Sequence, residues 1–103
     1  MYFRITEDSV ELVEPENLTA FHAVRSPGLG DAAFAESVRR AGLGEPVGDG
    51  HLMVSIDAVR RLAAGRVGPD WADGLAKMVA YAAGKGWVDE TGARVRAHVE
   101  IID

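Results

Sequence analysis

The sequence predicts an α+β fold in which about four helices pack on a mainly antiparallel sheet, built from an N-terminal and a C-terminal hairpin. Residues 2–12 and 87–101 alternate polar and apolar side chains, as half-buried strands do. Four stretches between them carry apolar residues at helical spacing. The 103 residues are enough to bury a hydrophobic core, so we expect one small globular domain spanning residues 1–103.

The N-terminal stretch predicts a β-hairpin. Alternation runs from Tyr2 to Thr6, stops at the turn-forming residues 7–9 and returns at Val10. The side chains expected on its buried face are Phe3, Ile5, Val10 and Leu12.

Residues 15–25 are expected to form a first helix. Pro15 suits the first turn of a helix, because its missing N–H would have no partner there. Leu18 and Phe21 would lie on the inner side of this helix, and the turn-forming residues 26–28 would end it.

Glycines bracket the second predicted helix. Asp31 is its expected N-cap, and Gly42 is expected to end it. Phe34 and Val38 would point into the core. The preceding Gly28-Leu29-Gly30 matches the letters of a dinucleotide-binding loop, but a predicted helix stands where that loop needs a buried strand. We therefore interpret these glycines as the boundary between two helices.

The middle of the chain predicts a loop, a strand and a third helix. Residues 45–50 are rich in turn-forming types, and His51 to Val54 is a short apolar run. We expect this strand to join the two terminal hairpins into one sheet. The third helix would start at Ser55 or Asp57 and end at Gly65. Its apolar face is expected to comprise Ile56, Val59, Leu62 and Ala63.

The fourth helix is predicted to follow Pro69, with Asp70 as its N-cap. Its main apolar stripe consists of Trp71, Leu75, Met78, Val79 and Ala82. A second stripe of small residues consists of Ala72, Ala76, Ala80 and Ala83. The two stripes together predict a helix that is covered from two directions, by another helix of this chain or of a second copy in a homodimer.

The C-terminal stretch predicts a second hairpin, which begins at Trp87 and turns at Asp89 to Gly92. Its second strand alternates strictly. The side chains expected to face inward are Val95, Ala97, Val99 and Ile101, and those expected to face outward are Arg94, Arg96, His98 and Glu100.

The composition excludes several classes of function. The chain has no cysteine, which removes thiolate nucleophiles and cysteine-based metal sites. His22, His51 and His98 are scattered and lack metal-ligand spacing, so we expect no metal and no cofactor. No apolar run resembles a signal peptide or reaches membrane-spanning length, so we expect a cytoplasmic protein with no membrane partner.

The order of the last elements also matches a DNA-binding winged helix. The fourth helix would then read DNA, and Arg94 and Arg96 on the wing would contact phosphate. The chemistry argues against a nucleic-acid partner. The helix presents a row of alanines in place of base-reading side chains, and residues 55–103 hold seven basic and seven acidic residues.

The leading functional hypothesis is a non-enzymatic accessory or interaction domain that binds a protein partner or a second copy. The candidate interaction residues are Arg94, Arg96, His98, Glu100, Trp71 and Trp87. The winged-helix regulator is the alternative. A small enzyme that uses His98 or His51 with a carboxylate is the second alternative, because catalytic residues need only be adjacent in space.

Overall fold

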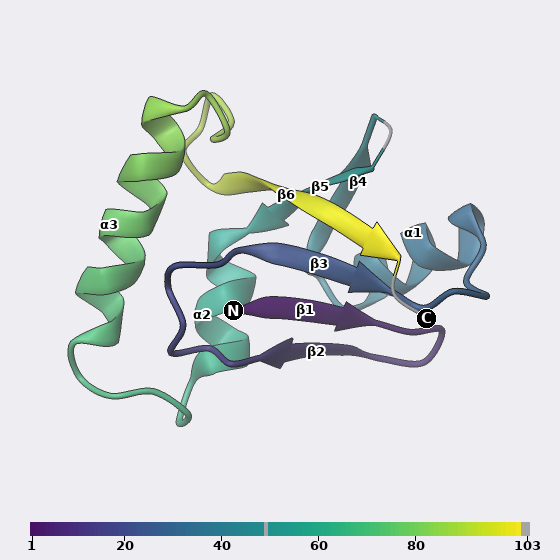
Figure 1. Ribbon diagram of the computed structural model, residues 1–103, viewed down its shortest axis with the longest axis horizontal. Helices are drawn as coiled ribbons and strands as arrows, with labels where there is room; N and C mark the ends of the chain where they lie inside the picture. The colour runs from purple at the N-terminus through teal and green to yellow at the C-terminus, as the bar shows by residue number, and fades with distance from the viewer. Residues whose placement is uncertain (49, 102–103) are drawn as a thin grey trace.

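Six strands form one curled, mixed sheet in the order β2-β1-β3-β6-β5-β4 (Figure 1). The computed structural model describes residues 1–48 and 50–101. The strands are β1 (Tyr2–Ile5), β2 (Val10–Val13), β3 (His22–Arg25), β4 (Gly44–Val47), β5 (His51–Ser55) and β6 (Arg94–Ile101). The helices of the described residues are α1 (Asp31–Arg40), α2 (Ile56–Ala63) and α3 (Trp71–Gly84). The α+β class is confirmed, but the prediction of four helices is wrong.

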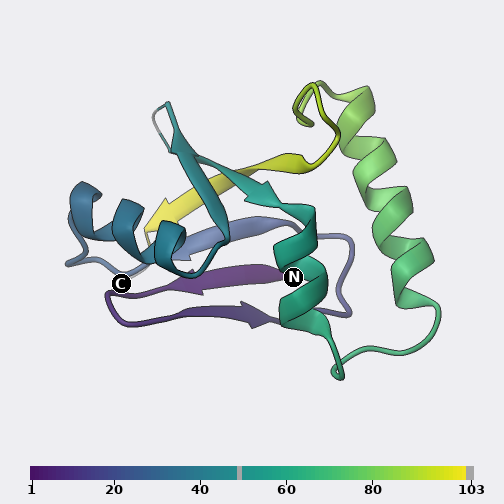
Figure 2. The same cartoon turned by 180° about the vertical axis from the view of Figure 1, so that it is seen from behind.

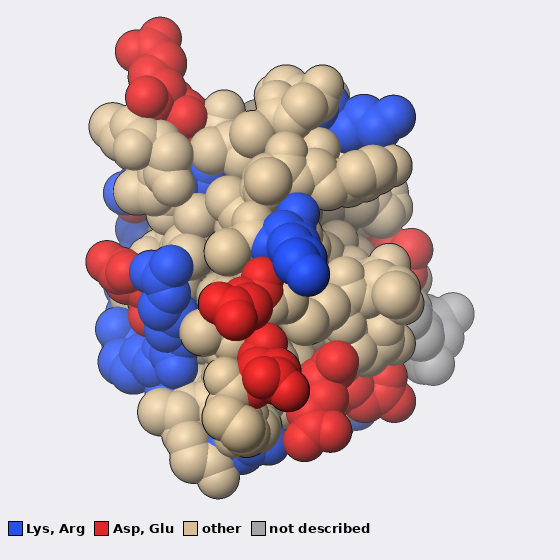
Figure 3. All heavy atoms as spheres, turned by 90° about the vertical axis from the view of Figure 1, so that its left-hand side faces the viewer, with Lys and Arg blue, Asp and Glu red and all other residues tan. Residues whose placement is uncertain are grey.

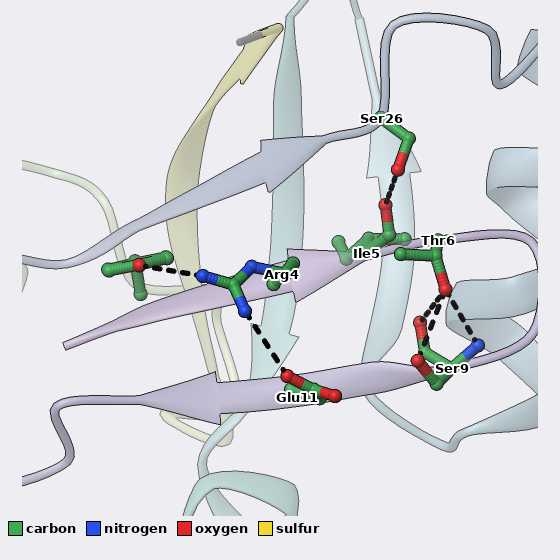
Figure 4. Close-up of polar contacts among 7 residues, drawn as sticks. Arg4, Ile5, Thr6, Ser9, Glu11 and Ser26 are labelled. Atoms are coloured by element: carbon green, nitrogen blue, oxygen red, sulfur yellow. Dashed lines mark hydrogen bonds and ion pairs between the residues drawn. The ribbon is translucent and has the colours of Figure 1, made fainter. Parts of the chain in front are cut away.

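The predicted N-terminal hairpin is confirmed. β1 and β2 pair antiparallel, with Phe3 opposite Leu12 and Ile5 opposite Val10. Phe3, Ile5 and Leu12 are buried, and Val10 packs against the same core. Polar side chains on and beside the hairpin bond to its strands and its turn (Figure 4). The Arg4 guanidinium donates to Glu11 Oε2 from Nη1 at 3.5 Å and to the Tyr2 hydroxyl from Nη2 at 3.3 Å.

The predicted helix at residues 15–25 is wrong, because this segment forms a loop and then β3. Glu14 has a left-handed backbone with φ of 53°, and a turn follows it in which Asn17 N–H donates to the Glu14 carbonyl. β3 lies parallel to both β1 and β6, which satisfy its backbone on two sides. Ala23 in its middle is fully buried.

The sheet is therefore mixed, and the prediction of a mainly antiparallel sheet is wrong. β3 links the N-terminal hairpin to β6, whereas β5 pairs on the far side of β6. The expected strand at His51 to Val54 exists, but it does not join the two ends of the chain. The expected C-terminal hairpin is reduced to a single bridge between Val88 and Val95. β6 takes its main partners from β3 and β5, so it is an interior strand.

Part of the predicted loop at residues 45–50 is the edge strand β4, which is a further correction. β4 pairs antiparallel with β5, and its Pro46 is tolerated because one side of an edge strand needs no N–H donor. Gly44 approaches β5 so closely that a Cβ there would lie 1.7 Å from the Met53 carbonyl oxygen.

α1 and α2 cover one face of the sheet (Figure 2). Phe34 and Val38 of α1 are buried, as predicted. Asp31 is not the N-cap, because Gly30 occupies that position and Asp31 instead pairs with Arg25 at 2.7 Å. Gly42 follows the helix with φ of 69°, as the prediction of a helix end requires.

α2 follows β5 directly. Ser55 caps it by accepting a hydrogen bond from Ala58 N–H at 3.2 Å, so the first of the two expected capping residues is confirmed. The buried residues of α2 are Ile56, Ala58, Val59 and Ala63, and Leu62 packs partly against the core. Gly65 takes up a left-handed backbone just after the helix.

α3 lies beyond one end of the sheet, beside the start of β6 (Figures 1 and 2). Leu75 and Ala82 are buried, and Trp71, Met78 and Val79 pack partly against the core. The small-residue stripe, formed by Ala72, Ala76, Ala80 and Ala83, is exposed. The expectation that this chain covers α3 from two directions is therefore wrong, and cover by a second copy stays a prediction. Figure 3 shows this side of the molecule, whose upper part is mostly uncharged and whose middle and lower parts carry both acidic and basic side chains.

Candidate functional site

The face of the sheet opposite α1 and α2 carries the outward residues of β6. Arg94, Arg96, His98 and Glu100 are exposed there, as predicted. On the other face Val95 and Ala97 are buried and Val99 is partly buried. Ile101 was expected to face inward, but its exposed fraction is 62% because it ends the strand beyond the core.

A row of four rings crosses this open face. Tyr2, His22, His98 and His51 stand in register on β1, β3, β6 and β5. The rings of Tyr2 and His22 stack with centroids 5.3 Å apart, and those of His51 and His98 meet edge to face at 6.1 Å. The three histidines, which look scattered in the sequence, are thus brought side by side by the strand order.

The histidine row does not form a metal cluster. Among residues 1–48 and 50–101, no group of three or more histidine, aspartate or glutamate side chains is placed to hold a metal ion. His22 and His51 flank His98 on opposite sides, so their strands are about 9.6 Å apart.

A groove opens between α3 and the open face of the sheet, and we name it the α3 groove. Its volume is about 300 Å³. It lies where the loop before β3, helix α3 and strands β5 and β6 meet. Its lining residues are Leu18, Thr19, Ala20, Phe21, His51, Met78, Tyr81, Ala82, Trp87, Arg96 and His98.

One side of the α3 groove is apolar and aromatic. Trp87 and Tyr81 meet edge to face with ring centroids 6.3 Å apart, and their exposed fractions are 37% and 63%. Lys85 Nζ lies 5.5 Å from the Tyr81 ring centroid, in the geometry of a cation–π contact. The helix contributes Met78 and Ala82 to the lining. An apolar ligand could therefore contact both aromatic rings and the helix.

The other side of the α3 groove is polar, with Arg96, His51 and His98. Neither an ion pair nor a hydrogen bond joins the Arg96 side chain to the residues that the structure describes. His98 Nε2 lies 3.9 Å from Glu100 Oε1 on the same strand. The groove thus combines apolar side chains of α3 and of the loop before β3 with polar side chains of β5 and β6.

The structure separates the sequence-predicted interaction residues into groups. Arg96, His98 and Trp87 line the α3 groove. Glu100 is not a lining residue, but its carboxylate lies near the His98 ring. Arg94 borders a different hollow, near Arg39 and Glu45.

Trp71 has a structural contact of its own. Its indole Nε1–H donates a hydrogen bond of 2.6 Å to the Pro15 carbonyl. It thereby holds the loop before β3 against the start of α3, and it is not itself a lining residue of the groove.

Sequence reasoning missed several residues of the groove lining and of the row of rings beside it. His22 and Tyr2 of the ring row, and Leu18, Phe21 and Tyr81 of the lining, were not candidates. Tyr81 had a visible signal, since it falls on the polar strip of an otherwise apolar helix. The others had none, because their neighbours in the groove belong to strands and helices far away in the sequence.

The winged-helix hypothesis depended on a two-stranded wing after α3. Only the Val88 to Val95 bridge represents that wing in the described part of the chain, and β6 lies inside the sheet. None of the described helices is both long and apolar enough to cross a membrane. The chain matches no family model, no curated protein and no solved structure.

Proposed function

We propose that the chain is a non-enzymatic binding domain and that the α3 groove is its site for a small, largely apolar ligand. The observation that carries this proposal is a concave, aromatic-lined hollow with a few polar side chains on its sheet side, which is the usual form of a small-molecule site. Its 300 Å³ is at the small end of such sites. If each heavy atom takes about the volume of one water, the ligand has roughly ten non-hydrogen atoms.

The distribution of exposed apolar side chains supports this choice of surface. Among the described residues, the large hydrophobic side chains that stay exposed are Tyr81, Trp87 and Ile101. Two of these three line the α3 groove. Exposed aromatic surface is unfavourable in water, and its concentration in one hollow is typical of a binding site.

The test uses a neutral probe of the expected size, phenylpropionamide, titrated into the protein while backbone amide shifts are followed by NMR. We expect saturable binding with a dissociation constant of about 1 mM, the range for a ligand of this size. The shifted amides should lie on the lining of the groove. Trp87→Ala removes one aromatic wall and should weaken binding several-fold.

The matched control is Ile101→Ala, which removes an exposed apolar side chain outside the groove. It should leave the affinity unchanged. The proposal fails if phenylpropionamide does not saturate, or if Trp87→Ala and Ile101→Ala have the same effect. A thermal melt of each variant shows whether it keeps the fold.

A small histidine-dependent enzyme is the second candidate, favoured by one observation. His98 lines the groove beside His51 and has the Glu100 carboxylate 3.9 Å from its Nε2. A carboxylate in this position could orient the imidazole for proton transfer. Turnover of small activated esters above the rate given by free imidazole would support it. Equal rates for the wild type, His98→Gln and Glu100→Gln would reject it.

A further inference from the structure

We propose that the ligand of the α3 groove is a small amphipathic anion, whose apolar body lies against the aromatic wall and whose oxyanion group binds Arg96. This inference rests on the proposed function and narrows it to one chemical class. The carboxylate or related acid group would sit at the polar end with His51 and His98, and the hydrocarbon part would lie beside Trp87 and Met78.

The first argument is the sign of the charge inside the groove. The chain has a formal net charge of −5, yet none of the described lining residues is acidic. Arg96 is the charged side chain of that lining, so the local charge is opposite to that of the whole protein. A cation beside apolar walls attracts anions more strongly than one surrounded by water, because the walls screen less.

The second argument is that the Arg96 side chain has no hydrogen-bond or ion-pair partner among residues 1–48 and 50–101. Other arginines are held by carboxylates of this chain: Arg4 by Glu11, Arg25 by Asp31, Arg39 by Glu45 and Arg60 by Asp57. No described carboxylate lies within ion-pair distance of Arg96. Glu100 is on the same face of β6 but lies near His98. The guanidinium is therefore free to bind an oxyanion through two parallel hydrogen bonds.

The third argument is the presence of further donors at the same end. His98 and His51 stand side by side in register on β6 and β5, with their rings edge to face. The His98 imidazole carries an N–H that can donate to an oxygen. Arg96 offers donors only and no acceptor, and His98 on the same strand adds one donor, so this part of the lining suits an oxyanion.

The experiment compares two probes of nearly the same shape that differ in the group at one end. Phenylpropionate carries a carboxylate where phenylpropionamide carries a neutral amide. We expect wild-type protein to bind phenylpropionate about tenfold more tightly than the amide, as one charge-assisted hydrogen-bond pair predicts. Both affinities are measured by NMR titration at low salt.

The variants assign the preference to one side chain. Arg96→Gln should bring the two affinities together by weakening the binding of phenylpropionate, and Arg96→Lys should keep part of the preference. The matched control is Arg94→Gln, which makes the same charge change on the same face of β6 but beside a different hollow. It should keep the tenfold preference.

Three results would overturn the inference: equal affinities of the wild type for the two probes, an undiminished preference in Arg96→Gln, or an equal loss in Arg94→Gln. In each of these cases saturable binding of phenylpropionamide, weakened by Trp87→Ala, would leave the proposed function standing. If neither probe binds, both proposals fall.

Discussion

The imidazole rings of His51 and His98 meet edge to face, with centroids 6.1 Å apart and planes inclined at 70°. The two residues are opposite each other where β5 and β6 pair antiparallel. Side chains at such positions belong to the same face of the sheet. The pair therefore links the two strands across the open face, and both residues line the α3 groove.

This geometry predicts a measurable coupling between the two rings. Cross-strand ring pairs contribute a few tenths to about 1 kcal/mol, so a double-mutant cycle of His51→Ala and His98→Ala should give a coupling of about 0.5 kcal/mol in the free energy of unfolding. The control cycle pairs His51 with His22, which lie on strands separated by β6. It should give a coupling near zero. Equal couplings in the two cycles would contradict the observed strand order.

Local patterns predicted the elements whose partners are near in sequence. The β1 to β2 hairpin, the Ser55 cap of α2 and the inner faces of α1 and α2 follow from spacings within a few residues. β3 was missed because Pro15, Leu18 and Phe21 have helical spacing, while only Ala23 and its neighbours form the strand. β3 is a strand because it pairs with β6, where His22 lies opposite His98. A partner so distant in the sequence leaves no local signal.

The site was predictable only as a list of outward residues. Alternation along β6 correctly indicated that Arg96 and His98 face away from the core. Their common neighbours depend on which strands flank β6 and on where α3 lies. Since β5 was expected between the terminal hairpins, the sequence could not place His51 beside His98 and Trp87 in one groove. The alanine stripe led to the wrong prediction that this chain covers α3 from two directions. Helical spacing shows which face of a helix is apolar, but it does not show whether another element covers that face.

Adding a single methyl group at Gly44 should strongly lower the free energy of unfolding. A Cβ at this position would lie 1.7 Å from the Met53 carbonyl oxygen, a backbone atom held by the pairing of β4 with β5. Gly44→Ala should therefore lower the free energy of unfolding by about 2 kcal/mol, as overpacking does. Chemical denaturation measures it. Gly28→Ala is the control, because a Cβ there has no heavy atom within 4 Å and should change stability little.

The two tryptophans should respond differently to the same substitution. Trp71→Phe removes the hydrogen bond to the Pro15 carbonyl, so it should lower the free energy of unfolding by about 1 kcal/mol and speed amide exchange in residues 16–21. Trp87→Phe should cost less than about 0.5 kcal/mol, because that ring is partly exposed and its indole N–H has no hydrogen-bond partner among the described residues. A larger loss from Trp87→Phe would mean that the roles assigned to the two rings are reversed.

The loop before β6 predicts an acid-dependent stability. Although desolvation acts to raise the pKa of Asp89, hydrogen bonds from Thr91 and from backbone N–H groups of the loop together hold that pKa below its ordinary value of 3.8. Asp89 Oδ1 accepts from Thr91 Oγ1 at 2.9 Å and from Ala93 N–H at 3.1 Å. The lowered pKa means that the Asp89 carboxylate binds a proton less tightly in the folded state than in the unfolded state. The ionised carboxylate therefore stabilises the fold at pH values above 3.8.

That stabilisation is lost as the pH falls through the lower, folded-state pKa of Asp89. The difference in unfolding free energy between the wild type and Asp89→Asn should therefore be largest near neutral pH and shrink toward about pH 2. Denaturant titrations at a series of pH values measure it. Glu90→Gln is the matched control, since this neighbouring carboxylate accepts no hydrogen bond from the described residues, and its difference from the wild type should stay small throughout. A difference for Asp89→Asn that does not vary with pH would show that ionisation of the Asp89 carboxylate does not stabilise the loop.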